Sequence, residues 1–254
     1  MDNTKLKNRL GTKLQVLQEP TIVQPLELTE ESSGYPALAN DTLEIVRENL
    51  KNQPLSPELL DMVKSPSGGS TVFSVPGLNG DEIEKELTGI ILDYTTPRAY
   101  WDTPDPVEGT PPVCLSTDSI LSQDGKPCIR CPFNDFGSRD GETGAKACKE
   151  SVLLFLLRPD SILPILVRIP VTSKPRFLKY VVRLIGMRTP ISGVVTRITL
   201  EKATSKSGKP YALYNFEAVG LLSPEETAMA KAFGAQLMEN MNVAAVVPKP
   251  EEGE

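Results

Sequence analysis

Four cysteines are the residues of this chain whose type and spacing could carry chemistry. Cys114, Cys128, Cys131 and Cys148 all fall within one 35-residue window with the spacing C-x13-C-x2-C-x16-C. The central CIRC places two thiolates on one tight turn, as in zinc ribbons, and the outer two cysteines approach from either side. This pattern predicts one structural Zn²⁺ ion held by four thiolates, with no open coordination position for catalysis.

Disulfides, redox activity and unliganded buried thiols are the alternatives to a zinc site. Paired disulfides require an oxidising compartment, but the N-terminal sequence has no apolar stretch like that of a signal peptide. No apolar run approaches the roughly 18 residues that span a bilayer, so we expect a soluble, intracellular protein. Redox activity and unliganded buried thiols remain the alternatives to a metal site.

Composition narrows the possible functions further. The 254 residues include no histidine, so Ser-His-Asp or Cys-His nucleophilic sites and His-ligated metals are excluded. We therefore expect no enzymatic activity. The net charge is −6, yet residues 151–220 carry +8 and the rest of the chain −14. This asymmetry favours a polyanion-binding surface, with a merely solvated basic face as the alternative.

The cysteine-rich window must be positioned by the elements around it. We divide the chain into an N-terminal arm with short helices (1–68), a β domain (69–222) that contains the insertion (102–150), and a C-terminal helix with an acidic tail (223–254). Ser56-Pro57-Glu58 has the composition of a helix start. Ser223-Pro224-Glu225-Glu226 predicts a capping box at the start of the last helix.

The β domain is predicted from runs rich in β-branched and aromatic residues. We expect strands within 71–77, 86–101, 151–157 and 162–170 and a long hairpin over 190–220. Residues 173–187 change to helical period. The apolar face of that helix is Phe177, Tyr180, Val181, Leu184 and Ile185, and its basic face is Arg176, Lys179 and Arg183.

This order of elements predicts a mainly β protein with flanking helices. It is the order of an OB-fold, a five-stranded Greek-key barrel, here with a zinc ribbon inserted between the first two barrel strands. A mixed α+β sandwich is the alternative arrangement of the same elements.

Several sequence motifs resemble those of a known protein family. CPFNDFGS and GAKACK, followed by the basic helix and SGVVTRITLEKATSKSGKPYALYNFEAV, resemble phage and prophage proteins similar to single-stranded DNA-binding proteins. The resemblance covers roughly residues 86–235. In architecture the chain is also similar to the zinc-containing OB-fold of the replication protein A large subunit, and its hairpin to OB-fold modules of bacterial replicative polymerases. The resemblance implies a protein of the bacterial host cytoplasm.

An OB-fold binds a single strand through cations for the phosphates and aromatic faces for the bases. Our candidate contacts lie at the end of the first strand, in the insertion and along the hairpin. They are Tyr94, Arg98, Tyr100, Trp101, Arg130, Phe136, Lys146, Arg168, Arg197, Lys202, Lys206, Lys209 and Tyr211. Tyr94, Tyr100 and Trp101 could equally form an apolar plug, and Phe133 is expected to pack beneath the metal turn.

Together these features predict a sequence-tolerant single-stranded DNA-binding protein that acts in replication or recombination of a phage or mobile element. RNA is the alternative strand, because the sequence does not separate the two. The rival function is a protein-interaction adaptor, whose zinc ribbon and barrel dock onto a replication or nuclease partner.

Overall fold

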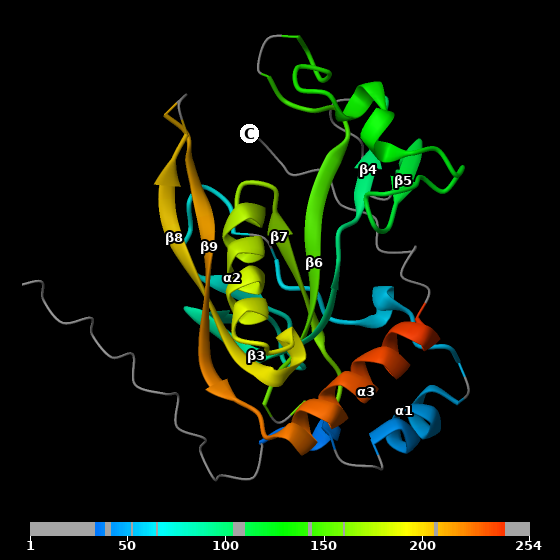
Figure 1. Ribbon diagram of the computed structural model, residues 1–254, viewed down its shortest axis with the longest axis vertical. Coiled ribbons are helices and arrows are strands. Elements are labelled where there is room, and N and C mark those ends of the chain that lie inside the picture. The colour runs from blue at the N-terminus through cyan, green and yellow to red at the C-terminus, as the bar shows by residue number, and fades with distance from the viewer. Residues whose placement is uncertain are drawn as a thin grey trace, which may run out of the picture.

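The computed structural model describes residues 34–241 apart from 39–41, 52, 65, 104–109, 142–143, 160 and 206–207. The strands are β1 (Phe73–Val75), β2 (Glu82–Glu84), β3 (Glu86–Thr95), β4 (Arg98–Tyr100), β5 (Cys114–Ser116), β6 (Lys149–Leu157), β7 (Ile165–Pro170), β8 (Val194–Thr204) and β9 (Pro210–Leu221). The α-helices are α1 (Thr42–Leu50), α2 (Lys174–Gly186) and α3 (Pro224–Asn240). Single 3₁₀ turns lie at η1 (Pro36–Leu38), η2 (Pro57–Leu59), η3 (Cys128–Arg130), η4 (Pro132–Asn134) and η5 (Ile191–Gly193). The prediction of a mainly β protein with a few helices is confirmed (Figure 1).

Seven antiparallel strands form the main sheet. Six of them follow the order β5-β4-β6-β3-β8-β9, and the seventh, β7, pairs with β6 outside this order. Thr95 lies opposite Leu153, and Arg98 lies opposite Glu150. Because the register is continuous, β4 extends β3 along one edge of β6. The cysteine-rich insertion therefore leaves the sheet between β4 and β6, with β5 paired to β4.

The sheet is strongly staggered and coiled at β3. The first half of β3 pairs with β8 and its second half with β6, and Ile90 lies where the two pairings overlap. At the preceding position, a Cβ on Gly89 would lie 2.3 Å from the backbone oxygen of Leu157. A strand glycine at such a close backbone approach is typical of a bend in a coiled sheet.

The closed barrel predicted from the sequence does not form among the described residues, because β7 and β9 do not pair. Helix α2 lies against β9 instead, and residues 61–63 lie against β7. The Tyr214 amide of β9 donates instead to the Ser173 hydroxyl (3.0 Å), and the Val63 amide donates to the Leu166 carbonyl of β7 (2.9 Å). Side-chain and segment contacts thus satisfy edge groups that barrel closure would otherwise pair.

One face of the sheet encloses an inner core that α2 covers. Its largest members include Phe73, Leu154, Leu156, Phe177 and Tyr214. Ala212 and Tyr214 of β9 are buried, and the half-buried Phe216 packs against the same core. The Phe177 ring packs edge-on against the Phe216 ring at 5.3 Å between centroids.

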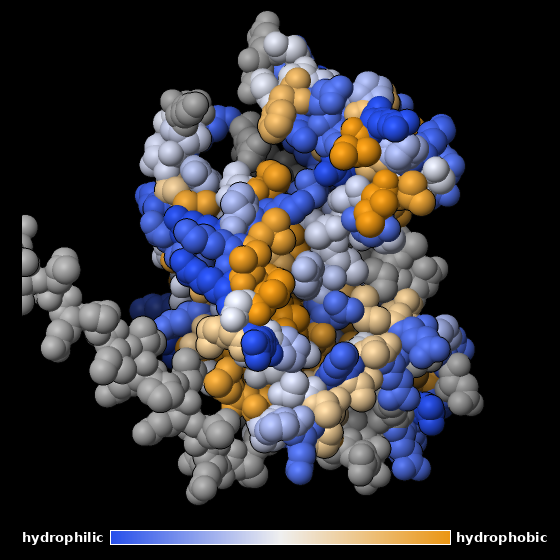
Figure 2. Space-filling model, viewed as in Figure 1, coloured by the Kyte–Doolittle hydropathy of each residue, from blue (hydrophilic) through white to orange (hydrophobic). Residues whose placement is uncertain are grey.

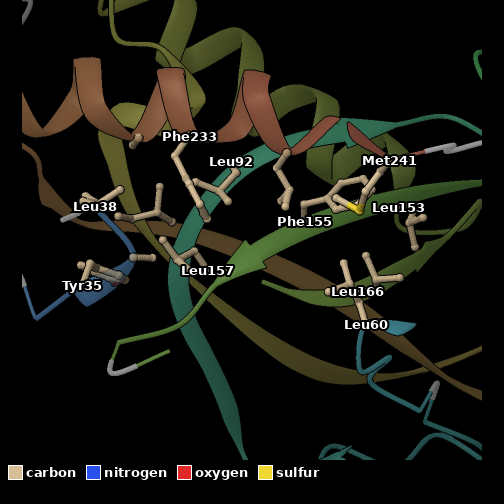
Figure 3. Packing of buried hydrophobic residues seen from close by; sticks show 14 residues of the cluster. Tyr35, Leu38, Leu60, Leu92, Leu153, Phe155, Leu157, Leu166, Phe233 and Met241 are labelled. Carbon is tan, nitrogen blue, oxygen red and sulfur yellow. The ribbon is translucent and has the colours of Figure 1, made fainter. Parts of the chain in front are cut away.

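The opposite face is covered by α3 and by residues near the N-terminal end of the described chain (Figure 3). Phe233 of α3 points down onto Leu92 and Leu157 of the strands, and Tyr35 and Leu38 pack in the same cluster. Tyr35, Ala37 and Leu38, expected to belong to the N-terminal arm, are therefore part of the core. Residues 1–33 of the arm and residues 242–254 at the C-terminus lie outside the described residues.

The helix predictions hold in part. Ser223 and Glu226 form the predicted capping box, with the Ser223 amide donating to the Glu226 carboxylate at 2.9 Å and the Glu226 amide donating to the Ser223 hydroxyl at 3.2 Å. At Ser56 only the 3₁₀ turn η2 forms, and Ser56 makes no side-chain cap. Ile185, expected on the buried face of α2, is exposed. None of the described helices has the length and apolar composition needed to cross a bilayer.

Candidate functional site

The insertion places its first cysteine by extending the sheet. Cys114 begins β5 directly opposite Tyr100 of β4. The Val113 amide donates to the Tyr100 carbonyl at 2.8 Å, which holds the returning chain against β4. The first thiol is therefore positioned by regular strand pairing rather than by loop structure.

Tight turns position the other three cysteines. Gly125 has a φ of +73°, which glycine adopts without strain, and its turn leads into the CIRC segment. The Cys131 amide donates to the Cys128 carbonyl at 3.2 Å, and the Cys148 amide donates to the Phe133 carbonyl at 2.8 Å. The first bond closes the CIRC turn, and the second brings Cys148 from the end of the insertion back to the segment that follows that turn.

All four cysteines line one cavity of about 220 Å³. None forms a disulfide; Cys128 and Cys148 are buried, and Cys114 and Cys131 are half-buried. Burial raises the pKa of the Cys148 thiol to about 12, against the opposing charge of Arg98. Burial and the neighbouring thiols of Cys131 and Cys128 also raise the pKa of Cys114. The thiols are therefore near enough to influence one another.

The donor set fits zinc in type and number, because four thiolates form a closed tetrahedral site. Among the described residues, however, no three or more Cys, Asp or Glu side chains stand close enough together to form a ready-made ion site. Zn–S bonds are about 2.3 Å long. Binding would therefore draw the four sulfurs inward across the cavity that they share.

A buried charge cluster joins the insertion to the sheet. Arg98 Nη2 lies 2.8 Å from Glu150 Oε2, and Lys174 at the start of α2 also contacts the Glu150 carboxylate. Burial alone would raise the pKa of Glu150, but the Lys174 hydrogen bond and the Arg98 charge outweigh it and hold the pKa below its ordinary value. Arg98 also donates to Asn134 in the insertion. The predicted phosphate-binding role of Arg98 is not supported, since its charge is already used within the protein.

The outer surface of the insertion presents an aromatic ring beside cations. Phe136 is 84% exposed, and Lys146 Nζ lies 4.4 Å from the centre of its ring. Arg130 is exposed between the two central cysteines, and its neighbour Ile129 is 82% exposed. The structure therefore brings the predicted contacts Arg130, Phe136 and Lys146 onto one small solvent-facing element.

The β8–β9 hairpin carries the second set of predicted contacts. Lys202 and Lys209 are exposed and Tyr211 is half-buried, while Lys206 lies outside the described residues. Arg197 is engaged within the sheet, 3.5 Å from Glu86 and 3.6 Å from Glu217. The hairpin tip and the insertion project from the same end of the molecule (Figure 1). We name Arg130, Phe136, Lys146, Lys202, Lys209 and Tyr211 the contact set.

Four further predicted contacts pack within the protein. Trp101 is buried and its indole donates to the Thr110 carbonyl at 3.0 Å. The Tyr94 ring packs edge-on against Phe177 (4.9 Å), and Tyr100 stacks on Phe133 (3.9 Å). These three aromatics therefore pack in separate places, Trp101 with Ala99 and Leu115 and Tyr94 against the inner core, and do not form one plug. Phe133 packs against Tyr100.

Arg168 is also buried. Its guanidinium lies beside the Met62 sulfur at 3.8 Å, under the segment that covers β7. A phosphate could not reach Arg168 without displacing that segment, so the structure does not support its predicted role.

Sequence reasoning missed Asn134 and Glu150. The Asn134 amide donates to the Cys128 carbonyl at 3.1 Å, and its oxygen accepts from Arg98 and from Lys146 (3.0 Å). Asn134 therefore links the CIRC turn to both cations. Its place in the CPFND turn was visible in the sequence, but its partners are distant in the chain.

Comparison of the chain with protein-family models, with curated proteins and with solved structures finds no match.

Proposed function

We propose that this chain binds single-stranded DNA without sequence preference. The observation that carries the proposal is the exposed Phe136 ring with the Lys146 ammonium 4.4 Å from its centre. An exposed aromatic face next to a cation can stack a base and contact the adjoining phosphate.

Strand topology supports an OB-fold as the scaffold for this function. In that barrel the first strand pairs with the second and fourth, the second with the third, the fourth with the fifth, and the third with the fifth. With β3, β6, β7, β8 and β9 as strands one to five, the first four relations are present, and α2 lies between strands three and four. Only the relation of β7 to β9 is missing. We therefore assign the chain to partly open OB-folds.

The scaffold also indicates where the strand lies. OB-folds bind through the face of strands two and three and through the loops between strands one and two and between strands four and five. Here α3 and residues near Tyr35 cover Leu153, Phe155 and Leu166 on the outer face of β6 and β7. The two loops, which are the insertion and the hairpin tip, carry the contact set, of which Arg130, Phe136, Lys202 and Lys209 are exposed and Lys146 and Tyr211 are half-buried. The proposed path therefore runs from the hairpin to the insertion.

A Zn²⁺ ion held by Cys114, Cys128, Cys131 and Cys148 would supply structural order to the insertion, and no catalysis. The chain's own residues then present the binding surface, because Cys148 is adjacent to the segment that holds Lys146 and the CIRC turn holds Arg130. The resemblance to phage single-stranded DNA-binding proteins supports this proposal, and on that basis we also propose a role in replication or recombination.

Fluorescence anisotropy with labelled oligo-dT, and with a duplex and an RNA of equal length, tests the proposal. We expect tighter binding to the single strands than to the duplex. Base stacking on an aromatic ring contributes about 1 to 3 kcal/mol, so Phe136→Ala should weaken oligo-dT binding by roughly five- to 150-fold. Leu78→Ala removes an equally exposed apolar side chain outside the insertion and the hairpin, and it should change nothing.

Salt dependence separates DNA binding from the adaptor alternative. Each neutralised phosphate contributes a slope of about −0.7 to the log-log plot for single strands. Four contacts from the cations of the contact set would give about −3, and Lys146→Gln should reduce the slope by about 0.7. Duplex binding as tight as single-strand binding, or a flat salt response, would refute the proposal, and the flat response would favour the adaptor.

A further inference from the structure

Helix α2 carries an unpartnered apolar stripe on its outer surface. Val171, Leu178, Val182 and Ile185 are between 39% and 66% exposed. Their spacing of seven, four and three residues places them on one face of the helix and of the turn before it. Figure 2 shows hydrophobic side chains gathered in a band over α2. Apolar side chains clustered in this way mark contact sites more often than isolated exposed residues do.

The stripe has a basic border. Helix α2 contains four cations and no acidic residue. Lys174 and Arg176 are engaged by Glu150 and Glu201. Lys179 and Arg183 directly follow Leu178 and Val182, are exposed, and make no ion pair within the described part of the chain. The border therefore keeps two positive charges that the protein itself does not neutralise.

We propose that the α2 stripe docks an acidic amphipathic helix of a partner protein. Leucine-like side chains on such a helix would cover Leu178, Val182 and Ile185 by packing ridges into grooves. Carboxylates at the border of the partner helix would face Lys179 and Arg183, which gives register and attraction. On α2 itself the stripe, from Leu178 to Ile185, covers about two helical turns, which is the length over which one short helix can pack.

Other occupants fit the surface less well. Single-stranded nucleic acid stacks on aromatic faces, and the stripe contains only aliphatic side chains. A two-fold contact between two copies would bring the same basic border against itself. Helices that lie on membranes carry a strongly cationic polar face opposite bulky apolar residues; here two of the four cations of α2 are paired with Glu150 and Glu201, and the stripe has no Trp or Phe. Charge complementarity therefore favours an acidic peptide.

The test uses the full chain and two fluorescein-labelled helical peptides. Both carry leucines along one face; one has glutamates at the borders, and the other has lysines. We expect the glutamate peptide to bind at least tenfold more tightly than the lysine peptide. Val182→Glu with Ile185→Glu should weaken that binding at least tenfold, and Lys179→Glu with Arg183→Glu should reverse the preference between peptides.

A matched control changes two other exposed apolar residues, Leu78→Glu with Ile83→Glu, and should leave peptide binding within twofold. The Val182→Glu, Ile185→Glu variant should keep wild-type thermal unfolding and oligo-dT affinity, so a failure of the docking proposal is distinguishable from a failure of DNA binding.

Three results would overturn the proposal. The first is equal binding of the two peptides, or equal loss in the control variant. The second is a wild-type dimer in sedimentation that Val182→Glu with Ile185→Glu converts to a monomer, which would assign the stripe to self-association. The third is binding to vesicles containing phosphatidylserine that the same variant abolishes, which would assign the stripe to a membrane.

Discussion

Arg98 and Glu150 lie directly opposite each other in β4 and β6, with Nη2 and Oε2 2.8 Å apart and both side chains mostly buried. This pair stands where the insertion leaves the sheet, and Asn134 extends it to the CIRC turn. The insertion is therefore attached to the sheet through a charge pair as well as through backbone pairing. Removing Glu150 would leave the buried Arg98 guanidinium without its charge partner, whereas removing Arg98 would leave Glu150 with Lys174 alone.

The first prediction follows from this pair. Arg98→Met should destabilise the protein by about 3 kcal/mol, the lower end of the usual cost of breaking a buried pair, because Lys174 still contacts Glu150. Urea unfolding followed by circular dichroism measures the change. Arg139→Met, in the exposed part of the same insertion, should stay within about 0.5 kcal/mol of wild type. Adding Glu150→Leu to Arg98→Met should recover part of the loss; no recovery would show that Arg98 acts through packing alone.

The second prediction concerns the metal. Purified protein should contain one zinc per chain, and Cys131→Ser should lose most of it, because three thiolates leave the ion weakly held. Metal analysis gives the stoichiometry, and hydrogen exchange should show protection lost first across residues 114–148. Asp124→Asn alters an exposed residue of the same cavity and should keep the metal. Protein without zinc, with all thiols freely titratable in the native state, would contradict the site.

The third prediction tests the coiling of the sheet. An added methyl at Gly89 would meet the Leu157 backbone oxygen, which cannot rotate away. Gly89→Ala should therefore cost about 3 kcal/mol or more. Gly186→Ala, at the end of α2 where nothing lies within 4 Å of the new methyl, should be neutral or stabilise by up to about 1 kcal/mol. Equal thermal midpoints for the two variants would mean that the strands separate freely at Gly89.

Local patterns in the sequence were sufficient for most elements. The change from period two to period 3.6 at residue 173 marked the start of α2, and the Ser223 capping box marked the start of α3. Turn residues at 205–210 located the hairpin, whose strands pair from Val194 with Leu221 to Thr204 with Pro210. Such signals are carried by neighbouring residues, and so they are readable without tertiary structure.

Burial and pairing that depend on residues distant in the chain could not be predicted from the sequence. Burial of Arg98 and Arg168 depends on Glu150 and on the segment around Met62, which are distant in the chain. Ile185 fits the apolar period of α2, but the sheet covers only the neighbouring part of the helix surface. The described strands β7 and β9 do not pair with each other; Asp61 and Val63 bond Leu166 of β7, and Ser173 accepts from the Tyr214 amide of β9, and these partners are distant in the chain.

The fourth prediction concerns Tyr35, which was assigned to the arm and is instead buried beside Leu38 and Phe233 (Figure 3). Its hydroxyl makes no hydrogen bond among the described residues, and burial raises its pKa to about 12. A buried hydroxyl without a partner costs free energy that a phenyl ring does not. Tyr35→Phe should therefore leave stability unchanged near pH 8 or increase it by about 1 kcal/mol.

The same substitution should change the alkaline limit of stability. In the unfolded chain tyrosine loses its proton near pH 10, whereas in the folded protein Tyr35 keeps it to about pH 12. Across that range the folded state binds more protons than the unfolded state, so stability falls as pH rises. Urea unfolding at about pH 8 and pH 11 should show a smaller loss for Tyr35→Phe than for wild type.

Tyr180→Phe is the matched control for the missing hydrogen bond. The Tyr180 hydroxyl bonds Thr196 at 2.7 Å, so its removal should cost about 1 kcal/mol near pH 8. A similar cost for Tyr35→Phe at that pH would show that the Tyr35 hydroxyl has a partner.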